Sequence, residues 1–338
     1  GQPSGLAEAI GITSGHLRDF AKGAALPDGM MKEARRLAGQ YGFFHWHLAF
    51  PEVFRSEARS GFDAFLGNPP WDHVEIKEKE WFAECCPKVA EAPNDSARKR
   101  LIAALRIEQP SLFEQFQDAL RQIEGESHML RDTGAFPLCG RGRINLYAVF
   151  AERTYRLIAP EGAAGMVMPT GLVTLDNNKE FFKEVMELNR LKAFVGFDNE
   201  EKTIFPDIDN NLTFAAVTLG NNGGVVPKFC FNIRQFGQLQ ESDRFFQLSA
   251  DDLTLLNPNT RTCPSFRSSR DAELTKTLYR RMTLIMREAP QETNIWGIRF
   301  KQGLFNMATD SNLFSTREQL ESAGWRLEGN KFVKDGQR

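Results

Sequence analysis

The stretch FDAFLGNPPW, residues 62–71, decides the fold that we expect for this chain. Its first six residues are mostly apolar and too few for a helix, so they favour a strand. The strand has to end at Asn68, because a proline restricts the residue before it and cannot donate a backbone hydrogen bond. We therefore predict a buried strand over 62–67 that ends in a rigid loop.

Segments with the periodicity of helices and of strands alternate after this loop. We expect helices over 96–125, with a break at Pro110, over 147–158 and over 176–191, and strands over 165–169, 191–197 and 212–219. Strands that alternate with helices imply a parallel or mixed sheet with both faces covered. The expected fold class is therefore α/β.

Changes in character divide the chain into three expected domains. Residues 1–60 form a helical segment with an aromatic lead-in, and residues 61–222 hold the alternating elements. A turn rich in glycine and asparagine at 220–224 marks the next boundary, and residues 223–338 have an α+β pattern. In this last region we expect an amphipathic helix over 274–285 and a short helix with a capping box at Ser315 and Glu318.

The composition excludes several classes of protein. The 338 residues are 41% hydrophobic with a net charge of −2, which allows a sizeable core and argues against a uniformly basic nucleic-acid coat. No run approaches the roughly 18 apolar residues of a membrane helix, and no signal peptide is recognisable, so we expect a cytoplasmic protein without a membrane partner. Five cysteines without a C-x-x-C pair predict reduced thiols and no metal.

The loop Asn68-Pro69-Pro70-Trp71 has the chemistry of an amino-group methylation site. An aromatic amino group is a weak nucleophile, and two acceptors, the Asn68 side-chain oxygen and the Pro69 carbonyl, can orient its lone pair. The prolines fix that carbonyl, and Trp71 can stack on the base. An Asn-Pro-Pro sequence alone is typical of any turn. The strand before it and the aromatic after it favour methylation.

The residues GFDAFLGNPPW (61–71) resemble the fourth motif of the gamma-class N6-adenine DNA methyltransferases, of the kind found in long fused type IIG restriction-modification methylases. The match continues in order through INLYAVFAERTYRL (144–157), GMVMPTGLVT (165–174) and FVGFDNEEKTIFPDIDNNLTFAAVTLG (194–220). Similar segments follow at 263–282 and 296–314, so the resemblance covers most of residues 41–334.

The resemblance implies both a fold and an activity. The fold would be the C-terminal half of a Rossmann-like methyltransferase sheet. The activity would be methyl transfer from S-adenosylmethionine to the exocyclic amino group of a flipped adenine in duplex DNA, as part of restriction-modification or phage defence. A fused or associated nuclease is a further expected partner.

The resemblance also implies a second aromatic at the base. The position that matches the aromatic of the eighth motif is Phe205, with Phe214 as the alternative, although core packing explains either residue equally well. The chain departs from the family at two positions. Asn145 stands where an aspartate is frequent, and Trp71 stands where a tyrosine is common.

The motifs that hold the methyl donor are not recognisable in this sequence. A strand that ends in a glycine-rich turn would be expected before Asn68, and the residues there read mainly as helices. We therefore expect a fragment that is inactive alone and does not bind the donor tightly. The strand over 62–67 would be left as an apolar sheet edge, which favours self-association.

A basic stretch in the last region is a candidate for contact with the DNA backbone. Its members are Arg267, Arg270, Arg280 and Arg281. Two alternatives to a DNA methyltransferase stay open at this stage. One is an amino methyltransferase acting on RNA or on a protein glutamine, and the other is a non-catalytic DNA-binding module.

Overall fold

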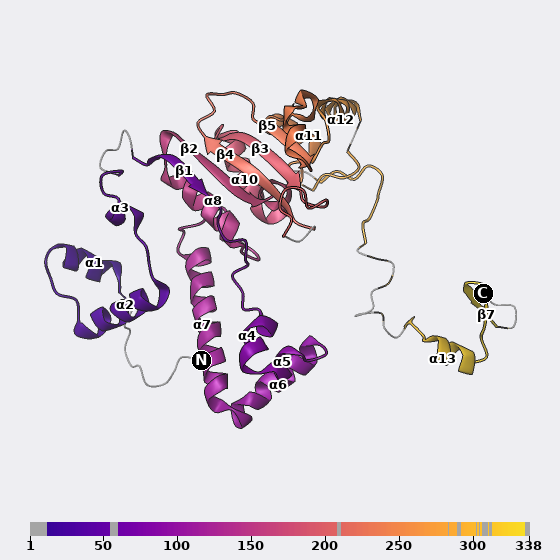
Figure 1. Cartoon of the computed structure of the whole chain (residues 1–338), viewed down its shortest axis with the longest axis horizontal. Helices are drawn as coiled ribbons and strands as arrows, with labels where there is room; N and C mark the ends of the chain where they lie inside the picture. The colour runs from indigo at the N-terminus through magenta and orange to yellow at the C-terminus, as the bar shows by residue number, and fades with distance from the viewer. Residues whose placement is uncertain are drawn as a thin grey trace. The chain divides into compact units, whose positions relative to one another are not determined.

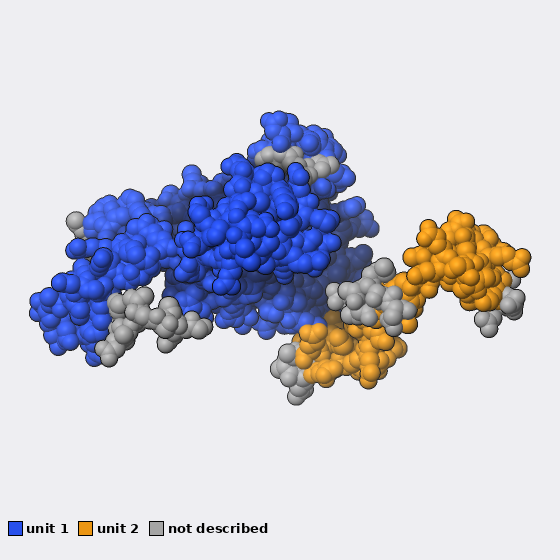
Figure 2. All heavy atoms as spheres, turned by 90° about the horizontal axis from the view of Figure 1, so that it is seen from below, with its two compact units in different colours: residues 1–283 blue, residues 284–338 orange. Residues whose placement is uncertain are grey.

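The computed structural model describes residues 12–54, 60–207, 211–282, 284–288, 292–301, 303, 305, 310 and 313–334. The chain divides into two compact units, residues 1–283 and residues 284–338 (Figure 2). Within the described ranges, no helix is both long enough and apolar enough to cross a membrane.

A six-stranded mixed sheet forms the centre of the first unit (Figure 1). Its strands are β1 (Phe62–Gly67), β2 (Ile158–Pro169), β3 (Leu191–Asp198), β4 (Thr213–Gly220), β5 (Lys228–Ile233) and β6 (Phe246–Gln247). Their order across the sheet is β1-β2-β4-β3-β5-β6. β1 is parallel to β2 and β3 is parallel to β5, whereas β4 runs antiparallel to both of its neighbours. The expected α/β class and the expected strands are confirmed.

Helices pack on one face of this sheet and share its main core. They are α8 (Leu146–Leu157), α9 (Gly171–Thr174), α10 (Lys179–Glu187), α11 (Ala250–Leu256) and α12 (Ser269–Arg281). Successive side chains of a strand point to opposite faces. Met166 and Met168 therefore lie in the main core, whereas Val167 packs on the other face with Phe197 and Phe214.

Four helices are inserted between β1 and α8 and have a small core of their own. They are α4 (Glu78–Cys85), α5 (Pro87–Ala90), α6 (Asp95–Glu108) and α7 (Pro110–Asp132). Phe82 and Phe116 are buried at the centre of this core. Pro110 begins α7, where its missing N–H has no helical partner to lose, so the expected break at this residue is confirmed.

The N-terminal region contains the helices α1 (Ser14–Ala21), α2 (Asp28–Tyr41) and α3 (Trp46–Ala49). Tyr41 packs against α7 at Gly125, where a Cβ atom would lie 2.1 Å from the Tyr41 hydroxyl oxygen. Only a glycine allows that approach. The rings of Trp46 and Phe50 lie edge-on to Phe62, with centroids 5.7 and 5.4 Å away. The aromatic lead-in therefore covers one face of β1.

The prediction of a fully buried strand over 62–67 is wrong. β1 pairs with β2 only, so it is an edge strand among the described residues, and Leu66 is 86% exposed. An edge strand is covered by a neighbour on one side only. The expected position of this strand at a sheet edge is thus confirmed among the described residues, whereas its burial is not. Self-association through this edge stays a prediction.

The structure also differs from expectation after residue 222. β5 pairs with β3, so residues beyond the expected boundary continue the same sheet and the first unit extends to residue 283. The helix expected over 274–285 is α12, which runs from Ser269 to Arg281. Its Ala272 is buried, whereas Leu274 and Leu278 are exposed.

The second unit contains α13 (Arg317–Ser322) and the hairpin of β7 (Arg326–Glu328) and β8 (Lys331–Val333). Its capping box joins Thr316 and Gln319, one residue after the expected pair of Ser315 and Glu318. Thr316 has the extended backbone of an N-cap residue, and its hydroxyl accepts from the Gln319 N–H.

Candidate active site at the carboxyl edge of the sheet

The loop Asn68–Trp71 directly follows β1 at the carboxyl edge of the parallel strands. β2 ends beside it at Pro169, which pairs with Phe214 at the start of β4. In open α/β sheets this edge is where ligands bind, because the loops that follow parallel strands converge there. The predicted catalytic loop and the predicted base-binding aromatics therefore lie at the same edge of the sheet.

Asn68 is exposed and forms part of the wall of a cavity. Its side chain makes no hydrogen bond to another residue in the described part of the chain, so its oxygen can accept one from a ligand. Pro69 and Pro70 line the same cavity. Their rings restrict the backbone dihedral φ, which limits the movement of the Pro69 carbonyl.

Asn145 fastens this loop to the start of α8. Its amide nitrogen Nδ2 donates to the Trp71 carbonyl at 3.0 Å, and its oxygen accepts from the Tyr147 N–H at 3.1 Å as the helix N-cap. The Leu146 N–H adds a bond of 2.9 Å to the Asp72 carbonyl. An aspartate could cap the helix, but an ionised carboxylate could not donate to Trp71. The departure at Asn145 thus has a structural reason.

The Trp71 side chain is half-buried at the end of the sheet, where it contacts the apolar residues of both faces. It packs against the main core and against the cluster of Phe197 and Phe214. Its indole Nε1 is buried without a hydrogen-bond partner among the described residues. An unsatisfied buried donor is costly, which makes this position of the ring less stable than its apolar contacts alone would suggest.

The two candidate aromatics differ in what they can offer a ligand. Phe214 is 4% exposed and stacks on Phe197 with ring centroids 5.1 Å apart, whereas Phe205 is 40% exposed. The Phe205 ring lies over Phe214 with centroids 5.0 Å apart. Of this pair, only Phe205 is exposed to solvent.

Asn199 holds Phe205 in place, although no local pattern in the sequence indicates this role. This residue is fully buried, and its amide donates to the Phe205 carbonyl at 2.9 Å and accepts from the Phe205 N–H at 3.1 Å. A single side chain thus satisfies both backbone groups of the exposed aromatic. Asn199 stands within the acidic sequence DNEE, 198–201, which reads as a solvated turn.

Arg234, directly after β5, fastens the same loop from outside. Its guanidinium pairs with Asp198 at 3.2 Å and with Glu201 at 3.5 Å, and also with Glu200. These carboxylates raise the pKa of Arg234, with Glu200 as the largest cause. The Thr203 hydroxyl donates to the Arg234 carbonyl. The loop is therefore held through both the side chain and the backbone of one residue.

A cavity of about 670 Å³ adjoins Asn68 on the face of the sheet that carries α8. Its size falls within the range of small-molecule sites. Most of its wall is apolar, and its aromatic members are Phe44, Trp46, Phe65, Phe136 and Phe150. Glu126 and Arg153 are its two charged members. This chemistry fits an elongated ligand with a planar ring and a charged end.

The cavity and Phe205 lie on opposite sides of the sheet. Met166 of β2 lines the cavity, and its neighbour Val167 packs with the cluster that supports Phe205. The Asn68 loop therefore lies between a cavity on one side and an exposed aromatic ring on the other. No glycine-rich turn after a strand is present among the described residues that precede β1.

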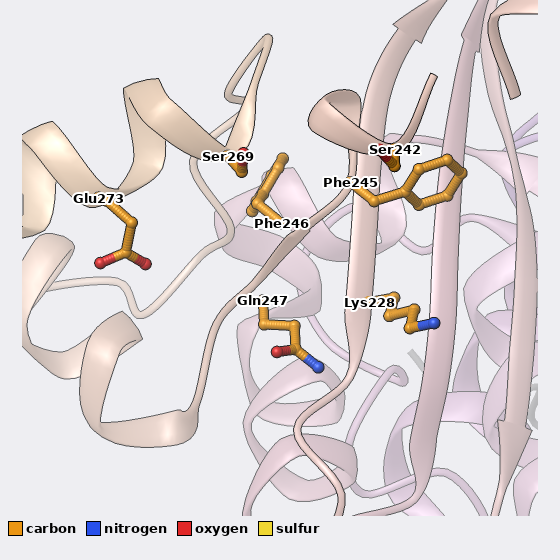
Figure 3. Close-up of a pocket in the computed structure, with 7 residues that line it drawn as sticks. All are labelled: Lys228, Ser242, Phe245, Phe246, Gln247, Ser269 and Glu273. Atoms are coloured by element: carbon orange, nitrogen blue, oxygen red, sulfur yellow. The ribbon is translucent and has the colours of Figure 1, made fainter. Parts of the chain in front are cut away.

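A second cavity, of about 520 Å³, lies beside β6, the strand at the other side of the sheet from β1 (Figure 3). Phe245 and Phe246 beside β6, Lys228 of β5 and Glu273 of α12 contribute to its wall. None of the residues predicted from the sequence lines it. It is therefore separate from the candidate site.

The predicted basic stretch is partly neutralised by acids of the same unit. Arg280 lies 3.5 Å from Asp252, and the nearby Lys276 is buried between Asp252 and Glu273. Arg267, Arg270 and Arg281 are exposed. The stretch does not form one continuous basic surface, and its contact with DNA stays a prediction.

No protein-family model and no curated protein sequence matches this chain. Among solved structures it is similar to the methyltransferase subunit of a type I restriction-modification system from Streptococcus thermophilus, with 14% identity over 42% of this chain and 35% of that chain and a TM-score of 0.31. It is also similar to a chain of a type I restriction-modification complex, with 11% identity, 65% and 42% coverage and a TM-score of 0.35.

A third similar structure is the type IIG restriction endonuclease BpuSI, with 20% identity over 33% of this chain and 12% of that chain and a TM-score of 0.24. The chain thus spans between 12% and 42% of the length of these three proteins. Likenesses of this extent leave the function to be argued from the site itself.

Proposed function

We propose that this chain carries the base-binding side of an adenine-N6 DNA methyltransferase that uses S-adenosylmethionine. The observation that carries the proposal is the Asn68 loop, which lies at the carboxyl edge of the sheet between a ligand-sized cavity and the exposed ring of Phe205. In-line methyl transfer requires the nitrogen lone pair to meet the methyl carbon directly, opposite the donor sulfur, so the donor and the base must both reach the Asn68 loop. The cavity and Phe205 give the two ligands separate approaches to that loop.

The adenine amino group has two N–H donors, and the loop supplies two acceptors for them. The Asn68 side-chain oxygen takes one, and the Pro69 carbonyl takes the other. Two such bonds pull the nitrogen toward tetrahedral geometry and free its lone pair for attack. When bound, S-adenosylmethionine would supply the methyl group through cleavage of its sulfur–methyl bond, with S-adenosylhomocysteine as the leaving group. The nitrogen would lose a proton to solvent as its bond to carbon forms.

Phe205 and Trp71 hold the extruded ring in the proposed site. Phe205 offers its exposed face, and Phe214 supports Phe205 from below rather than touching the base. Aromatic stacking contributes roughly 1–3 kcal/mol per base, which offsets part of the cost of unstacking it from the duplex. Trp71 adds a second contact if its indole turns outward, and this would also end the burial of its unsatisfied N–H.

The wider assignment is part of the same proposal. The partner is duplex DNA in restriction-modification or phage defence, with backbone contacts at Arg267, Arg270, Arg280 and Arg281 and a fused or associated nuclease. In the proposed division, residues 1–60 lead into the core, 61–222 form the second half of the catalytic domain, and 223–338 begin the target-recognition region. The first part of this last range still adds β5 and β6 to the catalytic sheet.

The test is methylation by the protein expressed from its complete reading frame, with and without Asn68→Ala. Loss of one of the two oriented acceptors should lower the rate of adenine methylation in duplex DNA by about a hundredfold or more. Because Asn68 makes no hydrogen bond within the described residues, its removal should leave stability to urea unchanged.

Asn221→Ala is the matched control, since Asn221 is also exposed and follows β4 at the end of the strands opposite the loop. A normal rate in Asn68→Ala would contradict the role of Asn68. Methylation of RNA or of a protein glutamine in place of DNA would favour the other amino methyltransferases. DNA binding without methylation of any substrate would favour a non-catalytic module.

A further inference from the structure

Arg153 lies on α8 in the wall of the Asn68 cavity. It is half-buried, and its guanidinium carbon lies 4.7 Å from the centroid of the Phe136 ring. Burial lowers the pKa of this guanidinium. The ring gives a cation–π contact, which compensates only part of the hydration that the charge has lost.

No acidic group among the described residues forms an ion pair or hydrogen bond with Arg153. The adjacent Glu152 is fully buried and already engaged, since it pairs with Arg156 at 2.9 Å and accepts from the Cys139 N–H at 2.8 Å. Arg153 therefore has only the Phe136 ring and the charge of the neighbouring Glu152 to offset its burial, which is unfavourable for a purely structural role. It is instead well suited to receive an anionic group that enters the cavity.

The same cavity contains a charge of the opposite sign. Glu126 is half-buried in the wall and accepts one hydrogen bond, from Gln122 at 3.3 Å. One cation and one anion in a single apolar cavity complement the carboxylate and the ammonium group of a free amino acid. The aromatic rings of Phe44 and Trp46 in the same wall suit a planar ring or a sulfonium.

We propose that Arg153 binds the carboxylate at the amino-acid end of the methyl donor, with Glu126 taking its ammonium group. The proposal rests on the function proposed above and adds donor-binding residues to it. A guanidinium can hold a carboxylate through two parallel hydrogen bonds, and an ion pair in a mostly apolar wall is stronger than one in water.

The experiment compares two ligands on the whole chain by ligand-observed NMR, which detects weak binding. S-adenosylhomocysteine has the amino-acid end, and 5′-methylthioadenosine lacks it while keeping the adenine, ribose and thioether. The wild-type chain should prefer S-adenosylhomocysteine roughly five- to tenfold. Arg153→Met, which keeps an apolar stem, should remove this preference and leave the affinity for 5′-methylthioadenosine unchanged.

Arg121→Met is the matched control, because Arg121 is exposed on α7 and pairs with Asp118 away from the cavity. A preference that survives Arg153→Met would overturn the proposal, as would a wild-type chain that binds neither ligand. If Arg153→Met instead weakens the binding of inorganic phosphate or of a DNA oligonucleotide and leaves the affinity for S-adenosylhomocysteine unchanged, Arg153 would be assigned to the DNA backbone.

These outcomes are separate from failure of the proposed function. If Asn68→Ala abolishes methylation while Arg153→Met leaves ligand preference intact, only the donor assignment fails. If the ligand preference depends on Arg153 and the protein methylates no adenine, the cavity keeps its ligand and the reaction has to be assigned again.

Discussion

Two loops meet at the same edge of the sheet and are held in different ways. The loop after β1, residues 68–71, is stiffened by its own two prolines and needs one side chain from elsewhere, Asn145. The loop after β3 begins at Asn199 and has a single proline, Pro206, directly after Phe205; its residues 199–205 are held by the buried amide of Asn199 and by Arg234. The first loop depends mainly on its covalent structure, and the second depends mainly on its contacts.

The difference corresponds to what each loop has to position. Two acceptor atoms that orient one nitrogen must be fixed closely, and the proline rings supply most of this restraint within the loop itself. A stacking ring tolerates more movement, because every position over the base retains some contact. We therefore expect the second loop to be far more sensitive to single substitutions that remove tertiary contacts.

The largest effect should come from Asn199→Ala. It removes two hydrogen bonds and leaves the N–H and the carbonyl of Phe205 without their partner. We expect the free energy of unfolding to fall by about 2–3 kcal/mol, as measured by urea denaturation. The Phe205 N–H should also exchange faster, whereas the Tyr147 N–H, which donates to Asn145 beside the Asn68 loop, should keep its rate.

Asn221→Ala serves as the control, because Asn221 is an exposed asparagine whose loss leaves no buried group unpaired. Equal losses of stability in the two variants would mean that the buried amide of Asn199 has no special role. Equally faster exchange at both N–H groups would show that the two loops are not held independently.

A smaller effect should come from Asn145→Asp, which tests the one tertiary bond of the Asn68 loop. Aspartate is as good an N-cap as asparagine and interacts favourably with the start of a helix, so α8 should keep its stability. The bond to the Trp71 carbonyl is lost, and we expect a cost of about 1 kcal/mol in unfolding free energy. Urea denaturation measures it.

Asn145→Ala provides the comparison, since it removes the cap as well as the bond to Trp71 and should cost about 2 kcal/mol. If Asn145→Asp is as damaging as Asn145→Ala, the cap rather than the loop contact explains the residue. If neither variant changes stability, the prolines alone hold the loop.

The same difference explains which parts of the site could be read from the sequence. Asn68 and its prolines were predictable, because their rigidity and hydrogen-bonding groups are properties of consecutive residues. Phe205 was predicted only together with Phe214, and burial separates the two in the structure. Asn199 and Arg234 could not be found, since a polar residue in an acidic turn gives no local sign that it is buried or bonded at a distance.

The fold shows a similar division. The alternation of apolar segments predicted the strands of the sheet, because strand periodicity is local. It failed for Leu66, whose exposure depends on whether a further strand pairs with β1. It also failed for Leu274 and Leu278, because Ala272 and not the larger residues of α12 meets the core.

The smallest expected effect concerns Trp71, where the first loop carries a cost that its prolines do not remove. Trp71→Phe loses apolar contact and at the same time removes the buried Nε1–H that lacks a partner. Trp81→Phe in the core of α4 to α7 loses apolar contact alone. We therefore expect Trp71→Phe to cost about 1 kcal/mol less than Trp81→Phe in urea denaturation. A larger cost at Trp71 would show that its N–H is satisfied in solution, and the ring would then have no reason to turn outward toward a base.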